Sequence, residues 1–269
     1  MKYFLSLLAF ILLFSVATPA QDYAIKQLEE SPRHHEWVTI ESSGRTMHNF
    51  VAYPERADKA PVVIVIHENR GLNDWARSFA DQLAEQGFIA IAPDLISNTV
   101  EGVEKTTDFE NTDAARSAIY ALNPDNVTAD LFAVLEYSKT IKAGNGKIAV
   151  VGFCWGGSQS FRFATNAGDK IKAALVFYGT GPTNENDYAN IEVPVYGFYG
   201  GADNRVNATI EDSEKAMTKF KKNYTYEIYD GAGHAYMRQG DNPELPKTEP
   251  NVVARNSSWE RIISILSEL

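Results

Sequence analysis

The sequence predicts an α/β fold, in which helices cover both faces of a mostly parallel sheet. Short, nearly continuous apolar runs alternate along the chain with amphipathic segments. This alternation is typical of parallel strands buried on both faces and of the helices that connect them. Residues 21–269 contain no internal repeat and no dividing linker, and their length suits one large domain. We therefore expect a single α/β domain over residues 21–269.

The domain is expected to open with a hairpin. Residues 36–40 and 47–53 alternate enough between apolar and polar side chains to form two strands. The polar run SSGR at 42–45 has the composition of a turn and joins them.

The remaining elements follow from the change of pattern after this hairpin. The apolar runs predict strands over residues 62–66, 89–92, 148–151, 173–178, 195–199 and 225–229. The amphipathic segments predict helices over residues 74–86, 112–122, 129–142, 156–167, 209–221 and 252–269. Residues 98–111 are the most polar segment and form a candidate mobile loop or lid. Ligands of open α/β sheets bind beyond the carboxyl ends of the strands, so residues that follow a strand are candidates for a site.

The N-terminus has the features of a secretory signal peptide. Lys2 provides a basic start, residues 3–16 are almost entirely apolar, and Thr18 and Ala20 are small residues suited to cleavage. The apolar stretch is shorter than the roughly 20 residues that a spanning helix needs. We therefore expect residues 1–20 to be removed and the protein to be secreted or periplasmic. The alternative is an uncleaved N-terminal anchor.

The charge of the chain argues against several classes of partner. The formal net charge is −10, and removal of Lys2 with the leader leaves 24 basic and 35 acidic residues, or −11. A chain this acidic is a poor match for nucleic acid or for an anionic membrane surface. The sequence has no ligand-spaced Cys/His cluster and no phosphate loop, so we expect neither a metal nor an organic cofactor. The expected partner is a small molecule, and the protein is expected to be a monomer.

The only cysteine, Cys154, lies where a predicted strand meets a predicted helix. It is the centre of the run GFCWGG at 152–157. A run of this kind matches a nucleophile elbow, in which a sharp turn holds the nucleophile above the sheet and glycines leave room for neighbouring backbone. The start of a helix also favours a thiolate. The alternative is a buried structural cysteine, but a lone thiol in an exported protein faces oxidation and therefore indicates a function.

Two further strand ends supply the partners that such a cysteine needs. Asp203 follows the strand over 195–199, and His234 follows the strand over 225–229. The order nucleophile, acid, histidine is that of α/β-hydrolase triads. Cys154, Asp203 and His234 are therefore the candidate nucleophile, orienting acid and general base.

Each of these assignments has an alternative. Asp203 lies in a Gly-rich turn, where aspartate is favoured for local hydrogen bonds alone. Asp230 is a competing carboxylate, and His234 has the alternative of a surface histidine at a turn. Three histidines near the N-terminus are expected to be surface or structural residues: His34, His35 and His48.

A second loop of interest is the run HENRG at 67–71, which directly follows a predicted strand and precedes a helix. α/β hydrolases take an oxyanion donor from this place, so the backbone N–H groups of Asn69 and Trp155 are the predicted pair. Glu68 is unusual here, because a carboxylate in the cleft repels a thiolate. The alternative for Glu68 is a loop charge paired with Arg70.

With these motifs in place, the chain resembles the dienelactone hydrolase family, in particular its His-Glu-Asn-Arg-Gly branch. The resemblance covers essentially all of residues 21–269. It rests on the order and spacing of residues 67–72, 93–95, 152–157, 178–179, 203 and 233–234. It implies an α/β-hydrolase fold and a Cys-His-Asp enzyme that opens enol-lactones such as dienelactone without a metal or organic cofactor.

The resemblance also implies roles for three charged side chains. In the family, the glutamate that matches Glu68 contacts the resting cysteine, and substrate binding rearranges this contact so that thiolate forms only with substrate present. A thiol that is protonated at rest is less easily oxidised. The family holds the substrate carboxylate with two arginines, and Arg116 and Arg238 are the matching candidates. The planar fork of arginine suits bidentate binding of a carboxylate.

The segment over 235–243 departs from the aromatic-rich pattern of the family. The resemblance therefore supports lactone or ester hydrolysis more firmly than dienelactone as the physiological substrate. Two other functions fit the same fold: a non-catalytic ligand-binding or thiol redox-sensing protein, and a broad-specificity carboxylesterase. The complete triad argues against a sensor, for which a reactive thiol alone would serve.

Overall fold

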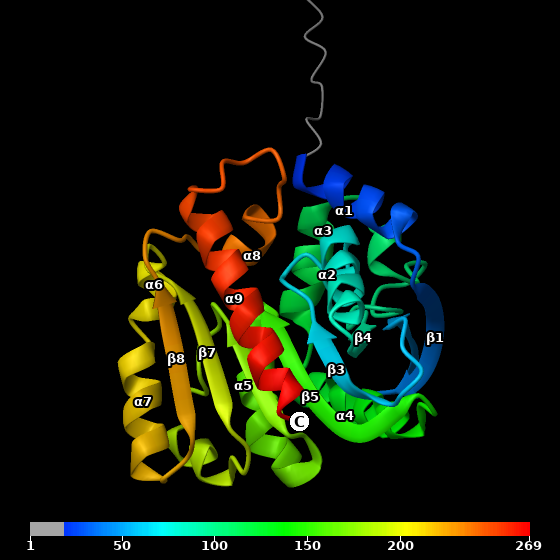
Figure 1. The fold of residues 1–269 in the computed structure, drawn as a ribbon. Coiled ribbons are helices and arrows are strands. Elements are labelled where there is room, and N and C mark those ends of the chain that lie inside the picture. Colours follow the sequence, from blue (N-terminus) through cyan, green and yellow to red (C-terminus); the bar gives the residue numbers. More distant parts are fainter. Residues whose placement is uncertain (1–18) are drawn as a thin grey trace, which may run out of the picture.

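A computed structural model describes residues 19–269 of the chain (Figure 1). The predicted leader, residues 1–20, lies outside the described residues except for Pro19 and Ala20, which open helix α1 (Pro19–Glu30). Within residues 19–269, no helix has the length and apolar character needed to cross a membrane.

The centre of the fold is one sheet that contains every strand predicted from the sequence. The strands are β1 (His34–Ser42), β2 (Arg45–Tyr53), β3 (Ala60–Ile66), β4 (Ile89–Pro93), β5 (Gly144–Phe153), β6 (Ala173–Phe177), β7 (Val195–Gly200) and β8 (Tyr224–Tyr229). Their order in space is β1-β2-β4-β3-β5-β6-β7-β8. β1 and β2 form the predicted antiparallel hairpin, and β2 also pairs antiparallel with β4. The other pairings are parallel.

Helices cover both faces of this sheet, as predicted. They are α2 (Asp74–Glu85), α3 (Thr112–Ala121), α4 (Pro124–Thr140), α5 (Trp155–Ala167), α6 (Asn204–Asn207), α7 (Ile210–Lys219), α8 (Tyr236–Gln239) and α9 (Pro250–Ser267), besides α1. On one face, residues of α1, α2, α8 and α9 share a hydrophobic core with Val151 and Phe153 of β5, and Figure 1 shows α2 and α9 in front of the sheet. On the other face, residues of α4, α5 and α7 share a second core with Ile148 and Val150. Alternate residues of β5 enter two cores, which explains its continuous apolar run.

The predicted helices are confirmed, but α4 begins at Pro124 rather than at residue 129. The side chain of Asn123 caps the helix by accepting the N–H of Asp125, and a proline at the first position suits the helical backbone. Three helices have no predicted counterpart: α1, α6 and α8. The last two are single turns, which are too short to show a helical period.

α1 is held against α2 by a buried carboxylate. Asp81 is fully buried on α2 and accepts hydrogen bonds from Arg33 and Ser31 at 2.7 Å and from Gln27 at 3.1 Å. Burial opposes the charged form, but the hydrogen bonds from Arg33, His35 and Ser31 outweigh it and lower the pKa of Asp81 to about 2. This charged network therefore holds α1 and the residues that precede β1 against α2.

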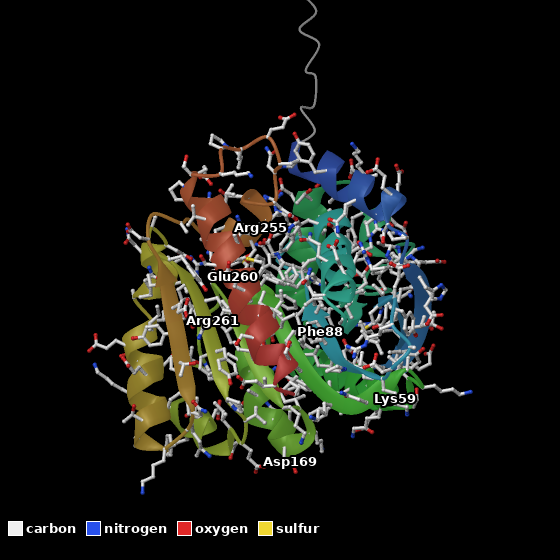
Figure 2. The ribbon with its side chains drawn as sticks, viewed as in Figure 1. Lys59, Phe88, Asp169, Arg255, Glu260 and Arg261 are labelled. Atoms are coloured by element: carbon white, nitrogen blue, oxygen red, sulfur yellow. The ribbon has the colours of Figure 1, made fainter. Side chains whose placement is uncertain are left out.

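Two arginines, both labelled in Figure 2, fasten α9. Arg261 donates to the carbonyl oxygen of Gly197 at 2.6 Å, and its guanidinium lies 4.3 Å from the centre of the Phe198 ring. Arg255 pairs with Asp241 at 2.6 Å. The C-terminal helix therefore holds both β7 and the loop that follows α8.

Glycines allow β5, α5 and β6 to approach closely at the turn after β5. A Cβ on Gly152 would lie 2.0 Å from the carbonyl oxygen of Gly156, and a Cβ on Gly157 would lie 2.5 Å from the carbonyl oxygen of Phe177. Neither position has room for a side chain, as the elbow prediction requires.

Gly152→Ala is expected to lower the free energy of unfolding by about 3 kcal/mol, because the methyl group would force β5 and α5 apart. Gly233→Ala is the matched control. The nearest atom to its added Cβ would be 3.9 Å away, so its effect should stay within about 0.5 kcal/mol. Urea denaturation measures both variants, and equal midpoints would contradict the steric argument.

Candidate active site

Cys154 lies at the turn between β5 and α5. Its backbone angles, φ 55° and ψ −115°, are strained for a residue that carries a side chain. Its N–H donates to the carbonyl oxygen of Phe177 at 3.0 Å, which fixes the turn on the neighbouring strand. The side chain is partly exposed. The predicted elbow is therefore present, and it holds the sulfur beyond the carboxyl end of the sheet.

His234 connects this thiol to a carboxylate. Its Nε2 lies 3.1 Å from Sγ of Cys154, and its Nδ1 lies 2.6 Å from Oδ2 of Asp203. Because an ionised carboxylate can only accept, Nδ1 carries the proton and Nε2 is the acceptor that faces the thiol. The competing carboxylate, Asp230, is exposed and stands outside this chain of contacts. The structure thus brings the three predicted residues together in the expected order.

Asp203 also serves the local fold. Its side chain is almost fully buried, and Oδ1 caps α6 by accepting the N–H of Val206 at 3.4 Å. The local hydrogen bonding considered as an alternative is therefore present, and it uses the oxygen that does not face His234. One carboxylate fills both roles.

The backbone amides of Asn69 and Trp155 both act on the thiol of Cys154. As backbone hydrogen-bond partners of this side chain, they lower the pKa of the thiol. Trp155 donates from the first turn of α5, and Asn69 donates from the loop after β3. Two converging N–H groups beside a nucleophile suit the oxyanion that forms when the nucleophile attacks a carbonyl carbon.

A buried histidine holds the loop that carries Asn69. His67 is fully buried, and burial lowers its pKa to about 4, so the ring is neutral near neutral pH. The N–H of Leu95 donates to Nε2 at 3.3 Å. Nδ1 is therefore the protonated nitrogen, and it donates to the carbonyl oxygen of Glu68 at 2.8 Å. The tautomer of His67 thus fixes the backbone next to Asn69.

The polar segment 98–111 supports the same loop. Thr106 donates from its N–H and its hydroxyl to the buried carboxylate of Asp94, at 2.6 and 2.8 Å. The same hydroxyl accepts the N–H of Leu72 at 2.9 Å. A Cβ on Gly71 would lie only 2.2 Å from this hydroxyl. The segment is therefore attached to the oxyanion loop at Thr106, and a lid motion elsewhere in it stays a prediction.

Glu68 pairs with Arg238, and the pairing with Arg70 considered as an alternative does not occur. Oε2 of Glu68 lies 2.7 Å from Nε of Arg238, and Oε1 accepts a hydrogen bond from the hydroxyl of Tyr178 at 3.3 Å. The residue is 3% exposed. Its two oxygens are thus bound to other side chains, and it acts on the thiol of Cys154 through its charge.

The surroundings of Cys154 raise the pKa of its thiol. Burial is the main cause, and the charge of Glu68 adds to it. The two amides and the charge of Arg205 act in the opposite direction. Burial therefore favours the protonated thiol and outweighs the amide of Trp155 at the start of α5, which acts in the direction that the sequence led us to expect.

Glu68→Gln is expected to lower the pKa of the Cys154 thiol, because it removes a nearby negative charge and leaves the charge of Arg238 unopposed. Since thiolate is the reactive form, iodoacetamide should alkylate this variant about ten-fold faster than the wild type at about pH 8. Cys154 is the only cysteine, so the increase in mass reports its rate alone. The exposed Glu260, changed to Gln, is the control. Equal rates in all three proteins would exclude an electrostatic role for Glu68.

A cavity of about 510 Å³ lies above the thiol. Its lining includes Cys154, His234, Tyr120, Ser158, Thr180 and Arg205. Neither of the two arginines predicted to bind a substrate carboxylate belongs to this lining. Arg238 is bound to Glu68, and Arg116 on α3 pairs with Asp113 at 2.7 Å. Within residues 19–269, no group of three or more acidic, histidine or cysteine side chains is placed to hold a metal ion.

Five of the lining residues have no role predicted from the sequence: Tyr120, Ser158, Tyr178, Thr180 and Arg205. Two of them carry a positional signal. Ser158 comes one helical turn after Cys154, and Arg205 comes two residues after Asp203 in the same strand-end loop. Tyr120, whose hydroxyl accepts from the side chain of Asn69 at 3.0 Å, depends on how α3 packs and has no such signal.

The sheet, the elbow and the loops around it define an α/β hydrolase. The model of the dienelactone hydrolase family matches residues 47–269, and the chain belongs to this family. A carboxymethylenebutenolidase-like protein of Saccharolobus solfataricus is 30% identical over 258 aligned residues, which cover 85% of this chain and 96% of the relative. One from Escherichia coli is 32% identical over 212 residues, which cover 74% of this chain and 76% of the relative.

Solved structures share the fold. A dienelactone hydrolase-like protein from Klebsiella pneumoniae has a TM-score of 0.75 at 23% identity, with 88% of this chain and 99% of that chain covered. A dienelactone hydrolase-like promiscuous phosphotriesterase from metagenomic libraries has a TM-score of 0.73 at 22% identity, with 88% and 98% covered. The chain is thus a dienelactone hydrolase-like ester hydrolase by family, with the α/β-hydrolase fold.

Proposed function

We propose that this protein is an exported cysteine hydrolase that opens a small lactone or ester. The observation that carries the proposal is the pair of contacts that joins Cys154 to His234 at 3.1 Å and His234 to Asp203 at 2.6 Å. In this proposal, Cys154 is the nucleophile and His234 is the general base. Asp203 holds the imidazole in the reactive tautomer and stabilises its charge. The proposal invokes no metal or organic cofactor.

The first half of the reaction forms a thioester. Nε2 of His234 takes the proton from Sγ of Cys154 while the sulfur attacks the carbonyl carbon of the substrate. The carbonyl oxygen becomes an oxyanion, which the amides of Asn69 and Trp155 stabilise. When the carbonyl re-forms, the C–O bond of the ester breaks, and the imidazolium returns its proton to the leaving oxygen. In a lactone, this leaving oxygen stays attached to the acyl group.

The second half of the reaction releases the acid. His234 takes a proton from water, and the resulting hydroxide attacks the thioester carbonyl while the same two amides hold the oxyanion. The C–S bond then breaks, and Sγ of Cys154 takes the proton back from the imidazolium. The resting thiol is regenerated, and one water is consumed for each ester bond broken.

Glu68 is proposed to keep the thiol protonated until substrate arrives. Its charge adds to the effect of burial on the pKa of Cys154, and Arg238 and Tyr178 hold it in place. Arg238 becomes available to a substrate carboxylate only if Glu68 releases it. Substrate binding and thiolate formation would then be coupled through one ion pair.

The proposal is tested by hydrolysis of a panel that contains dienelactone, neutral p-nitrophenyl esters and carboxylated lactones. Turnover is expected for at least one class, and acid quenching during turnover should leave an acyl group on Cys154 that denaturing mass spectrometry detects. Turnover of neutral esters alone would favour a broad carboxylesterase with the same nucleophile. Ligand binding with no turnover of any member would reject the hydrolase and favour a binding or sensing protein.

The export and the oligomeric state belong to the same proposal. We infer that the leader over residues 1–20 is cleaved and that the enzyme acts as a monomer outside the cytoplasm, over residues 21–269. The basic start, the apolar stretch and the small residues before Gln21 support the cleavage site. The intact mass of the exported protein and its mass by light scattering test the two parts separately.

A further inference from the structure

Arg205 is an unengaged cation in the cavity above Cys154. It is exposed on the first turn of α6, and its side chain lines the cavity. Among residues 19–269, Arg205 forms no hydrogen bond or ion pair with another side chain. Its charge reaches the sulfur, because it acts against the rise in the pKa of Cys154. An arginine with an unused planar fork near the reacting atom is available to a ligand.

The other arginines near the site are engaged or lie elsewhere. Arg238 is 17% exposed in its side chain and pairs with Glu68, and Arg116 pairs with Asp113. Arg70 lines a neighbouring cavity of about 270 Å³ instead. Of these four arginines, Arg205 is therefore the one that lines the cavity above the thiol.

The rest of the cavity wall has the character of an anion site. Its described lining contains no carboxylate, although the whole chain has a net charge of −10. Ser158 and Thr180 add hydroxyl groups that lie 3.1 Å from each other. An acidic protein with a carboxylate-free, arginine-bearing wall around its nucleophile repels anions in general but can bind one at this place.

We propose that Arg205 binds a carboxylate of the substrate and selects carboxylated esters or lactones over neutral ones. Because it concerns a substrate, this proposal rests on the proposed function. The anion site itself can be tested without any hydrolysis. It adds a contact to the two arginines that the family resemblance implies. It also places the specificity residue in the first turn of α6, two residues after Asp203, which orients the general base.

The test compares two alkylating reagents that differ only in charge. Iodoacetate and iodoacetamide both form an S–CH₂ bond with the thiolate and release iodide, but only iodoacetate carries a carboxylate. Any change in the pKa of Cys154 alters both rates equally, so their ratio reports anion binding alone. Arg205→Gln is expected to lower the ratio of iodoacetate to iodoacetamide rates roughly five-fold. Arg205→Lys should keep most of the ratio, since the charge remains.

Arg56→Gln is the matched control, because this arginine is exposed, pairs with Asp58 and does not line the cavity. Its ratio should equal that of the wild type, and added salt should lower the ratio in the wild type more than in Arg205→Gln. An unchanged ratio in Arg205→Gln, or an equal loss in Arg56→Gln, overturns the proposal. Equal slowing of both reagents also overturns it, since Arg205 would then act on the thiol alone.

The same variants separate this proposal from the proposed function. Wild-type and Arg205→Gln proteins are compared on a neutral p-nitrophenyl ester and on the mono-p-nitrophenyl ester of a dicarboxylic acid. If the alkylation ratio depends on Arg205 but no ester is turned over, the anion site is supported and the proposed hydrolase function is contradicted. Cys154-dependent turnover with an Arg205-independent ratio keeps the hydrolase and rejects the anion site.

Discussion

Cys154→Ala is expected to lower kcat roughly 10⁵-fold or more on every ester or lactone that the wild type hydrolyses. The variant keeps the cavity and the two amides of the oxyanion site, but no atom remains to form the thioester. Water would have to attack the carbonyl directly, from a position that the structure assigns to the sulfur. Initial rates under saturating substrate measure the loss, and substrate affinity by calorimetry should change little.

Cys154→Ser is the informative companion of the alanine variant. Serine restores a nucleophile at the elbow, but the hydroxyl has a much higher pKa than a thiol and places a smaller atom farther from Nε2 of His234. Its rate should lie above that of Cys154→Ala and well below that of the wild type. Sustained turnover by Cys154→Ala, at a rate near that of the wild type, would remove Cys154 from the mechanism.

The parts of the site that could be predicted from the sequence are those that strand ends and local turns determine. Cys154, Asp203 and His234 each lie in the turn or loop that follows a strand, and parallel strands place their carboxyl ends at one edge of the sheet. Their order along the chain therefore sufficed to bring them together. The amides of Asn69 and Trp155 were predicted by the same logic, because Asn69 lies in the loop after β3 and Trp155 begins the helix after β5.

The pairing of charged side chains could not be predicted in this way. Glu68 has Arg70 two residues away, yet it pairs with Arg238, which is far along the chain. The choice depends on which way each side chain leaves its loop and on the buried hydroxyl of Tyr178, and neither is encoded by spacing. Arg116 illustrates the same limit, because its helix was predicted correctly while the face that it occupies depends on packing.

The N-terminal helix α1 could not be predicted for a related reason. A short helix is marginal by itself in water and depends on tertiary contacts. Here those contacts converge on Asp81, a residue that a helical pattern alone would place on an exposed face. The burial of this carboxylate is explained by the three side chains that hydrogen-bond to it: Arg33, Ser31 and His35.

Asp203→Asn is expected to lower kcat about 10³- to 10⁴-fold, because the amide can turn its NH₂ group toward Nδ1 of His234. Nδ1 would then accept and Nε2 would carry the proton, which is the wrong tautomer for a base that faces the thiol. Asparagine can still cap α6 with its oxygen, so stability should change little. Thermal unfolding checks that the loss of activity is not a loss of fold.

The pH profile distinguishes this explanation from a general disturbance of the site. Without a correctly protonated imidazole, the residual rate of Asp203→Asn depends on thiolate that forms unaided. The pKa of Cys154 is raised, so this rate should keep increasing about ten-fold per pH unit well into the alkaline range. The wild type should rise less steeply. Asp230→Asn, which changes the exposed competing carboxylate, should keep wild-type rates, and a large loss there with none at Asp203 would exchange the roles of the two acids.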